Sequence, residues 1–86
     1  MIQLFRSDHF KKMFGKLPID IQDRTGDTLE RFLSNARHPS LHVKKMEGSP
    51  DIWEMRVTEN YRITFQYVRE GILLRKIGTH DVLRHP

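Results

Sequence analysis

The 86-residue sequence contains no cysteine. This absence excludes a disulfide framework and a thiolate metal site, and it suits a protein kept in a reducing compartment. The sequence also lacks a run of about 18 apolar residues, the length that a membrane-spanning helix needs. Its polar first segment, MIQLFRSDHFKK, has no apolar middle of the kind found in signal peptides. We therefore expect a cytoplasmic protein without a membrane partner.

Clusters of metal-ligating side chains are missing as well. Glu54, Glu59 and Asp81 are scattered, which argues against a two-metal site. The histidines outside the strand region, His9, His38 and His85, have no partners at ligand spacing. The sequence predicts no metal site and no cofactor.

The charge is moderately basic, with 15 Lys and Arg against 11 Asp and Glu, a net charge of +4. This excess is consistent with an anionic partner, and equally with a need for solubility. Residues 1–40 carry seven basic and five acidic side chains and residues 41–86 carry eight and six, so each part has a net charge of +2. Because neither end forms a basic tail, folding must assemble any anion site.

The hydrophobic period changes once along the chain, which predicts a single domain over residues 1–86 with helices first and strands later. A short strand near Ile2 and Leu4 is followed by a helix that Ser7 or Asp8 caps. Pro18 is expected in the first turn of a second helix, which Gly26 weakens by about 1 kcal/mol relative to Ala. The apolar stripes of the two helices are Phe10, Met13, Phe14 and Leu17, and Ile21, Thr25, Thr28, Leu29, Phe32 and Leu33.

After the breakers around Pro39 the period becomes two, which indicates three or four strands joined by turns at 47–50, 59–60 and 70–71. The predicted fold is α+β, with two N-terminal helices packed on one face of a small, mostly antiparallel sheet. Residues expected under the helices are Trp53, Met55, Val57, Tyr61, Ile63 and Phe65. Side chains alternate along a strand, so Glu54, Arg56, Arg62 and Thr64 should point to the other face. By the same alternation Lys76 shares a face with Ile72 and Leu74, and Arg75 with Leu73 and Ile77, but parity does not say which cation joins Arg62.

Two stretches, PSLHVKKMEGSPDIWEMRVTENYRITFQY (residues 39–67) and LLRKIGTHDVL (residues 73–83), resemble the RelE/ParE superfamily of toxins from type II toxin-antitoxin modules. The likeness spans nearly the whole chain, including the Leu17-Pro18 pair between the helices. The YRI strand and the closing GTH together favour the RelE/YafQ-like branch, whose members cleave mRNA.

The resemblance implies a set of site residues. The YR arginine of the RNA-cleaving members is Arg62, and the basic position on the preceding strand is Arg56. The GTH histidine, catalytic in the YafQ-like members, is His80, and a basic residue four positions earlier is Lys76, which decides the parity question in favour of Lys76. The further residues expected to face RNA are His42, Lys44, Lys45, Glu54, Tyr61 and Arg75.

Such residues suit RNA cleavage without a metal, because the 2'-hydroxyl of RNA can itself attack the adjacent phosphate. The enzyme then needs groups that transfer protons and cations that stabilise the charge growing on phosphorus. Imidazole titrates near neutral pH, and guanidinium offers paired donors to phosphate oxygens. The implied function is a metal-independent mRNA endoribonuclease that blocks translation at the ribosome, with mRNA, the ribosome and a cognate antitoxin as partners.

Other interpretations remain open at this point. The outward arginines are equally typical of solvated strand charges, and His80 could cap a strand end ahead of a final helical turn at Asp81. Glu54 replaces a lysine common in ribosome-dependent members, and acts either as a general base or as a countercharge to Arg56 or Arg62. Tyr61 stacks on a base or is buried. ParE-like members share the fold but inhibit DNA gyrase, and a third possibility is a non-catalytic homologue that only binds its antitoxin.

Overall fold

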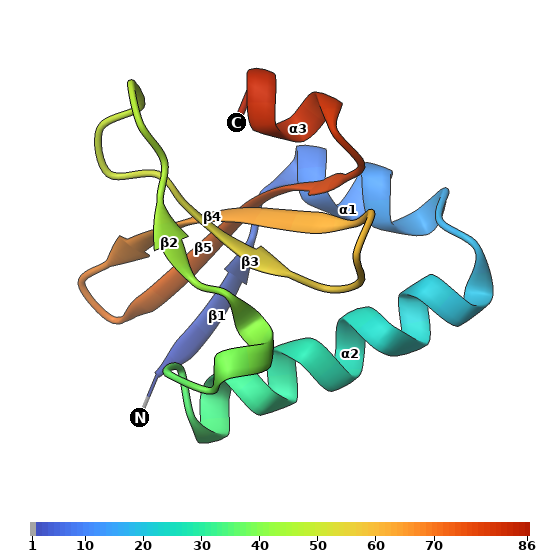
Figure 1. The fold of residues 1–86 in the computed structure, drawn as a ribbon, viewed down its shortest axis with the longest axis horizontal. Coiled ribbons are helices and arrows are strands. Elements are labelled where there is room, and N and C mark those ends of the chain that lie inside the picture. The colour runs from blue at the N-terminus through green and yellow to red at the C-terminus, as the bar shows by residue number, and fades with distance from the viewer. Residues whose placement is uncertain (1) are drawn as a thin grey trace.

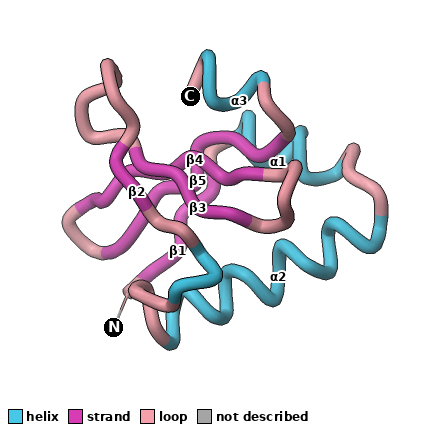
Figure 2. Tube along the Cα trace, in the orientation of Figure 1, coloured by secondary structure: helices cyan, strands magenta, loops and turns pink. Residues whose placement is uncertain are grey.

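The computed structural model describes residues 2–86, which fold into a five-stranded sheet with helices packed against it (Figures 1 and 2). In chain order the elements are β1 (Gln3–Arg6), α1 (Asp8–Gly15), α2 (Ile19–Ser34), the 3₁₀ helix η1 (Pro39–Leu41), β2 (Lys44–Lys45), β3 (Trp53–Arg56), β4 (Arg62–Val68), β5 (Gly71–Gly78) and α3 (Asp81–Arg84). Among residues 2–86 no helix is long and apolar enough to cross a membrane.

The strands lie in the order β1-β5-β4-β3-β2. β1 runs parallel to β5, and the other neighbouring strands are antiparallel. The predicted α+β fold with a mostly antiparallel sheet is therefore confirmed. The two sheet edges are the four-residue β1 and the two-residue β2.

Local signals place the helix starts. The Ser7 hydroxyl accepts a hydrogen bond from the Phe10 amide (3.0 Å) at the N-terminus of α1, as predicted, and donates one to the Arg75 carbonyl on β5 (2.8 Å). Pro18 was expected inside the first turn of α2 but lies at the N-cap position, because its ψ of 148° is extended. The helix accordingly begins at Ile19.

The hydrophobic core fills the space between the helices and one face of the sheet. Phe32 of α2 meets Phe65 of β4 edge-on, with 5.4 Å between ring centroids. Leu33 was expected in the same stripe but is 43% exposed, whereas Leu41 of η1 is fully buried and has no periodic pattern around it. The core residues are Phe10, Phe32, Leu41, Met55, Ile63, Phe65, Ile72, Leu74 and Ile77.

One irregularity in β5 changes its side-chain alternation. Thr64 pairs with Lys76, but Phe65 pairs with Leu74, so Arg75 has no partner in the ladder and forms a β-bulge. The buried residues of β5 are Ile72, Leu74 and Ile77. The predicted grouping of Lys76 with Leu74, and of Arg75 with Ile77, is therefore wrong, because the extra residue shifts the parity between Leu74 and Ile77.

The sheet face opposite the core is only partly open. Thr64 and Glu54 point to this face, as predicted, because they pair with each other in the same parity as Arg56 and Arg62. Thr64 is nevertheless fully buried and its hydroxyl donates to the Pro86 carbonyl (3.3 Å), and Glu54 is only 8% exposed. The segment that follows α3 thus covers the middle of this face and leaves the end near Arg62 accessible.

Candidate functional site

Arg62 begins β4 directly after the β3–β4 turn, and its side chain folds back onto that turn. Guanidinium Nη1 donates to the carbonyl oxygens of Thr58 (2.6 Å), Glu59 (2.8 Å) and Tyr61 (3.2 Å). The Tyr61 carbonyl also accepts a hydrogen bond from the Val57 amide (3.0 Å). No backbone amide of residues 2–86 donates to the Thr58 and Glu59 carbonyls, which the guanidinium is well suited to satisfy. The bonds all use one nitrogen, which fixes the orientation of the group while Nε and Nη2 remain able to donate to an anion.

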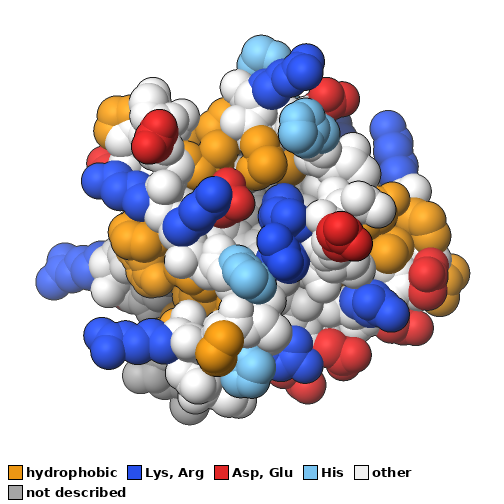
Figure 3. Space-filling view, in the orientation of Figure 1, with side chains coloured by type: hydrophobic (Ala, Val, Ile, Leu, Met, Phe, Trp, Pro, Cys, Tyr) orange, Lys and Arg blue, Asp and Glu red, His pale blue; other side chains and the backbone are white. Residues whose placement is uncertain are grey.

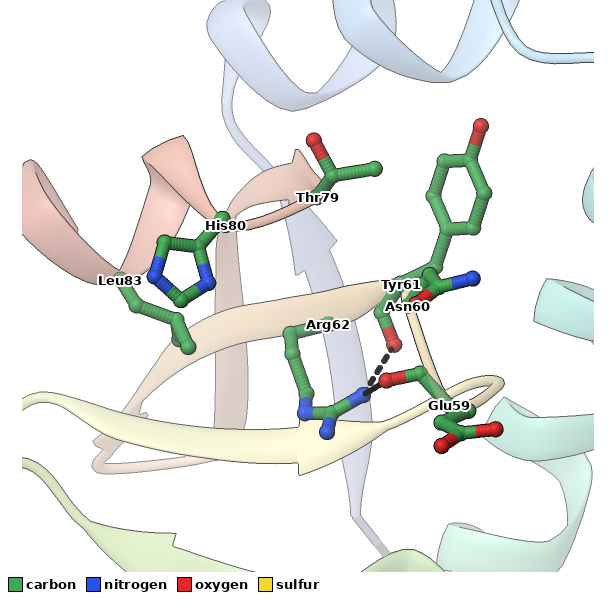
Figure 4. A pocket seen from close by; sticks show the side chains of 7 residues that line it. All are labelled: Glu59, Asn60, Tyr61, Arg62, Thr79, His80 and Leu83. Atoms are coloured by element: carbon green, nitrogen blue, oxygen red, sulfur yellow. Dashed lines mark hydrogen bonds between the residues drawn. The ribbon is translucent and has the colours of Figure 1, made fainter.

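Arg62 and His80 line the same cleft, which has a volume of about 410 Å³. Figure 4 shows the imidazole on one side, at the end of β5, and Arg62 across from it on β4. His80 is exposed and occupies the N-cap position of α3, but its side chain makes no capping hydrogen bond. The capping role considered for His80 is therefore wrong, although the helical turn at Asp81 is confirmed. The other lining residues are Glu59, Asn60, Tyr61, Thr79 and Leu83.

Arg56 sits beside this cleft, because it pairs with Arg62 across β3 and β4. Cross-strand partners point to the same face of a sheet, so the two cations are neighbours. Arg56 Nη1 lies 3.4 Å from Nε2 of His42, while its Nε is buried without a hydrogen-bond partner within residues 2–86. His42 has a left-handed backbone (φ 47°) at the end of η1, which turns its ring toward β3.

Lys76 and Arg75 hold the C-terminal segment against the sheet. Lys76 Nζ donates to the His85 carbonyl (2.7 Å), and Arg75 Nε donates to the Pro86 carbonyl (3.1 Å). Arg75 Nη1 also donates to the Gln66 side chain (2.8 Å). Both cations therefore lie on the same sheet face as Thr64, whose hydroxyl contacts the same C-terminal segment. Figure 3 shows Lys and Arg side chains spread over the face of the molecule that it draws.

No protein-family model matches the sequence, and no curated protein matches it. Solved structures do match over almost the whole chain. A chain of the RelB-RelE antitoxin-toxin complex from Methanococcus jannaschii is 22% identical, with a TM-score of 0.75 over 94% of this chain and 95% of that chain. A chain of the E. coli DinJ-YafQ toxin-antitoxin complex is 11% identical, with a TM-score of 0.77 over 95% of this chain and 96% of that chain. The YoeB/ParE toxin from Agrobacterium tumefaciens is 9% identical, with a TM-score of 0.77 over 92% of this chain and 99% of that chain.

The chain has the RelE/ParE toxin fold. The resemblance read from the motifs around Arg62 and His80 is thereby confirmed at the level of the fold. These identities are low, so the roles of individual residues rest on the geometry of this chain.

The RelE-like sheet separates two lysines that the sequence placed together. Lys44 pairs with Glu54, so it lies on the face of Arg56 and Arg62. Lys45 pairs with Trp53 and lies on the other face, because neighbouring strand residues alternate. Of the two lysines predicted to face RNA, only Lys44 therefore lies on the sheet face of Arg56 and Arg62.

Glu54 lies in a cross-strand row with Lys44 on one side and Thr64 on the other, and Lys76 follows Thr64. Glu54 thus has one cation, Lys44, as a cross-strand neighbour, and Thr64 separates it from Lys76. Tyr61 contributes its carbonyl to Arg62, and its ring points away from the Arg62 guanidinium and from His80 (Figure 4). A contact between the Tyr61 ring and RNA stays a prediction.

Several residues of the site were not predicted from the sequence. Asn60, Thr79 and Leu83 line the cleft, and Gln66 orients Arg75. Thr79 belongs to the GTH motif, but only His80 of that motif was assigned to the site. For Gln66 the sequence offers one indication: side chains alternate along β4, so Gln66 lies on the same face as Arg62. Within residues 2–86 no group of three or more His, Cys, Asp or Glu side chains is arranged to hold a metal ion.

Proposed function

We propose that this chain is the toxin of a type II toxin-antitoxin module and acts as a metal-independent endoribonuclease on mRNA at the ribosome. The observation that supports this function most directly is the shared cleft of His80 and Arg62. Arg56 and Lys76 add positive charge on the same sheet face. The arrangement offers a proton-transfer group beside several phosphate-binding cations.

The reaction that suits these groups is attack by a ribose 2'-hydroxyl on the adjacent phosphate. The 2'-oxygen forms a bond to phosphorus as its proton leaves, and the bond to the 5'-oxygen breaks as that oxygen gains a proton. His80 transfers one of these protons. Arg62, Arg56 and Lys76 stabilise the extra negative charge on the phosphate oxygens, with guanidinium donors suited to paired contacts.

The ribosome supplies what the site lacks. The cleft lies open at the end of the sheet, and its side chains do not enclose a substrate. Positioning of reacting groups accounts for a large part of enzymatic rate enhancement. An mRNA held in the ribosomal decoding site would arrive already oriented, so a small toxin would need to provide only the reacting groups and the cations.

A cognate antitoxin is the second proposed partner. The M. jannaschii and E. coli structures with this fold are toxin-antitoxin complexes. The basic face around Arg56 and Arg62 is complementary to an acidic or amphipathic segment. We expect a small gene beside this one to encode that segment.

Induced expression in cells tests the function. Primer extension should reveal new 5' ends inside coding regions, and co-expression of the neighbouring small gene should restore growth. His80→Gln, expressed to the same level, is the matched control and should leave messages intact. Arrested growth with intact messages and relaxed or broken DNA would instead support a gyrase inhibitor, as in the ParE-like branch.

A further inference from the structure

A second groove lies at the edge of the sheet, next to the cation site but outside it. It has a volume of about 460 Å³ and is walled by residues 36–39, His42, Val43, Trp53 and Tyr67. Trp53 meets Tyr67 edge-on, with 5.3 Å between centroids and 84° between ring planes. Tyr67 is 50% exposed, although the same ring also packs on Phe65. The groove therefore presents aromatic surface that no element of the described chain covers.

Two histidines give this groove hydrogen-bond donors. The Ser40 amide donates to Nδ1 of His38 (3.2 Å), so the proton of the neutral ring lies on Nε2. Nε2 of His42 lies 3.4 Å from Nη1 of Arg56, and because a guanidinium only donates, a hydrogen bond between them requires the ring proton on Nδ1. Each imidazole thus keeps one N–H that residues 2–86 leave without a partner.

The groove lies on the core-facing side of the sheet edge, where Trp53 pairs with Phe65, and His42 links it to the Arg56–Arg62 face. His42 lines the groove and also contacts Arg56. The edge strand β2 is only two residues long, and its two exposed lysines point to opposite faces of the sheet. Lys44 lies on the face of its partner Glu54, and Lys45 lies on the face of its partner Trp53. A nucleic-acid backbone that turns around this edge would meet a cation on each side, and Trp53 lies about 10 Å along β3 from Arg56.

We propose that this groove is a nucleotide-binding subsite that takes an unpaired base of the same RNA strand on which Arg62 and His80 act. The inference rests on the proposed ribonuclease function and extends it to a substrate class, single-stranded RNA read beyond the cleaved bond. The base stacks on Tyr67 or Trp53, and its edge accepts hydrogen bonds from His38 and His42. Lys45 and Arg37, both exposed, lie close enough in the fold to attract the neighbouring phosphates.

A base fits this groove better than an apolar protein side chain. An aliphatic residue would cover the aromatic rings but would leave the N–H groups of His38 and His42 desolvated and unpaired, which costs binding free energy. A nucleobase offers a flat face and acceptor atoms at its edge. The basic residues at the rim also match the phosphates on either side of the base.

Trp53 is the only tryptophan in the chain, so its fluorescence reports on this groove directly. The probe is a short single-stranded RNA with 2'-O-methyl riboses, which binds but cannot react. Anisotropy of a dye on the RNA measures total binding, and Trp53 emission measures occupancy of the groove. Binding of this RNA should quench Trp53 fluorescence. In a series of RNAs that each carry one abasic nucleotide at a different position, one RNA should bind more weakly and should no longer quench Trp53.

Variants at the rim provide the second measurement. Tyr67→Leu keeps apolar packing but removes the aromatic face, and should weaken RNA binding at least about 5-fold, the lower end of one lost base stack. The matched control is Val68→Thr, an exposed neighbour outside the groove, which should bind as the parent protein does. The salt dependence of binding should be the same for Tyr67→Leu and the parent, because no phosphate contact is lost.

The outcomes separate this inference from the proposed function. RNA that binds, and is cleaved on ribosomes, without quenching Trp53 overturns the subsite and leaves the ribonuclease intact. Quenching that no abasic position affects overturns it as well. If only the product of the neighbouring gene changes Trp53 emission, the groove is a protein contact. If the free RNA does not bind at all, the subsite is overturned, whereas cleavage on ribosomes still decides the ribonuclease function.

Discussion

Arg75 and Lys76 are consecutive residues of β5, yet both side chains lie on the sheet face that carries Arg62. The bulge at Arg75 makes this possible, because it leaves Arg75 outside the ladder while Lys76 pairs with Thr64. Their contacts agree with this placement, since they bind the carbonyls of Pro86 and His85. A regular strand would have turned one of the two cations into the core.

If both cations face RNA, both should contribute to the salt dependence of binding. Arg75→Gln and Lys76→Gln should each reduce the slope of log K against log salt concentration by about 0.7, the value for one phosphate of a single strand. Affinities measured at several salt concentrations give the slope. Arg69→Gln, an exposed cation in the β4–β5 turn, is the control and should not change it. An unchanged slope for Arg75→Gln would restrict that residue to anchoring the C-terminal segment.

Two glycines should respond in opposite ways to alanine. A Cβ at Gly71 would overlap the backbone of Gln3, its partner in the β1–β5 pair, so Gly71→Ala should lower the melting temperature strongly or prevent folding. Gly26 lies within α2, where an added Cβ would have no neighbouring atom within 4 Å, so Gly26→Ala should stabilise the protein by about 0.5–1 kcal/mol. Thermal melting of both variants tests the pair. A stable Gly71→Ala protein would contradict the parallel pairing of β1 with β5.

The fold was predictable because its main signals are local. The stripe that contains Phe10 and the alternation around Ile63 both follow from the period of each element, and the Ser7 cap is a one-residue signal. The bulge at Arg75 was not predictable in this way, because it depends on how β4 and β5 pair. Leu41 is buried through the packing of a 3₁₀ turn, which has no useful period.

The site was predictable only in part, for similar reasons. The resemblance named Arg62 and His80, and the structure brings both to one cleft. Spacing alone did not relate them, since the cleft joins the start of β4 to the end of β5. Neither the resemblance nor the residue spacing indicated that Arg62 binds its own turn, or that the C-terminal segment covers Thr64. Contacts between side chains and backbone carbonyls leave no pattern in the sequence.

Glu54 should oppose RNA binding. Glu54 is 8% exposed and lies in the row between Lys44 and Thr64, so it places a negative charge on the face that phosphates would approach. Glu54→Gln should therefore bind single-stranded RNA more tightly while cleaving it at a similar rate per bound complex. Anisotropy and single-turnover cleavage measure the two effects. A loss of cleavage of about 10²-fold or more with unchanged binding would make Glu54 the general base.

Arg62 should have separable roles in folding and in cleavage. Arg62→Ala removes the donor to three turn carbonyls, and hydrogen bonds from charged groups contribute about 1.5–3 kcal/mol, so melting should fall by about 6 °C or more. Arg62→Lys keeps a positive donor near the turn and should recover part of that stability. It should not recover cleavage, because an ammonium lacks the paired donors of guanidinium. Full activity in the Arg62→Lys protein would show that cleavage needs only a positive charge at this position, or that Arg62 serves the fold alone.

His80 should transfer a proton rather than support the fold. Its side chain is exposed and makes no capping bond, so His80→Gln should melt as the parent protein does. Cleavage should fall by about 10²- to 10⁴-fold, the usual contribution of a general acid or base. His85→Gln is the matched control: His85 is exposed too, and only its backbone carbonyl contacts Lys76, so activity should persist. Single-turnover cleavage on programmed ribosomes, with melting of the same samples, measures both. Full activity in a folded His80→Gln protein would remove His80 from the mechanism, and loss of activity only alongside a lower melting temperature would assign it a structural role.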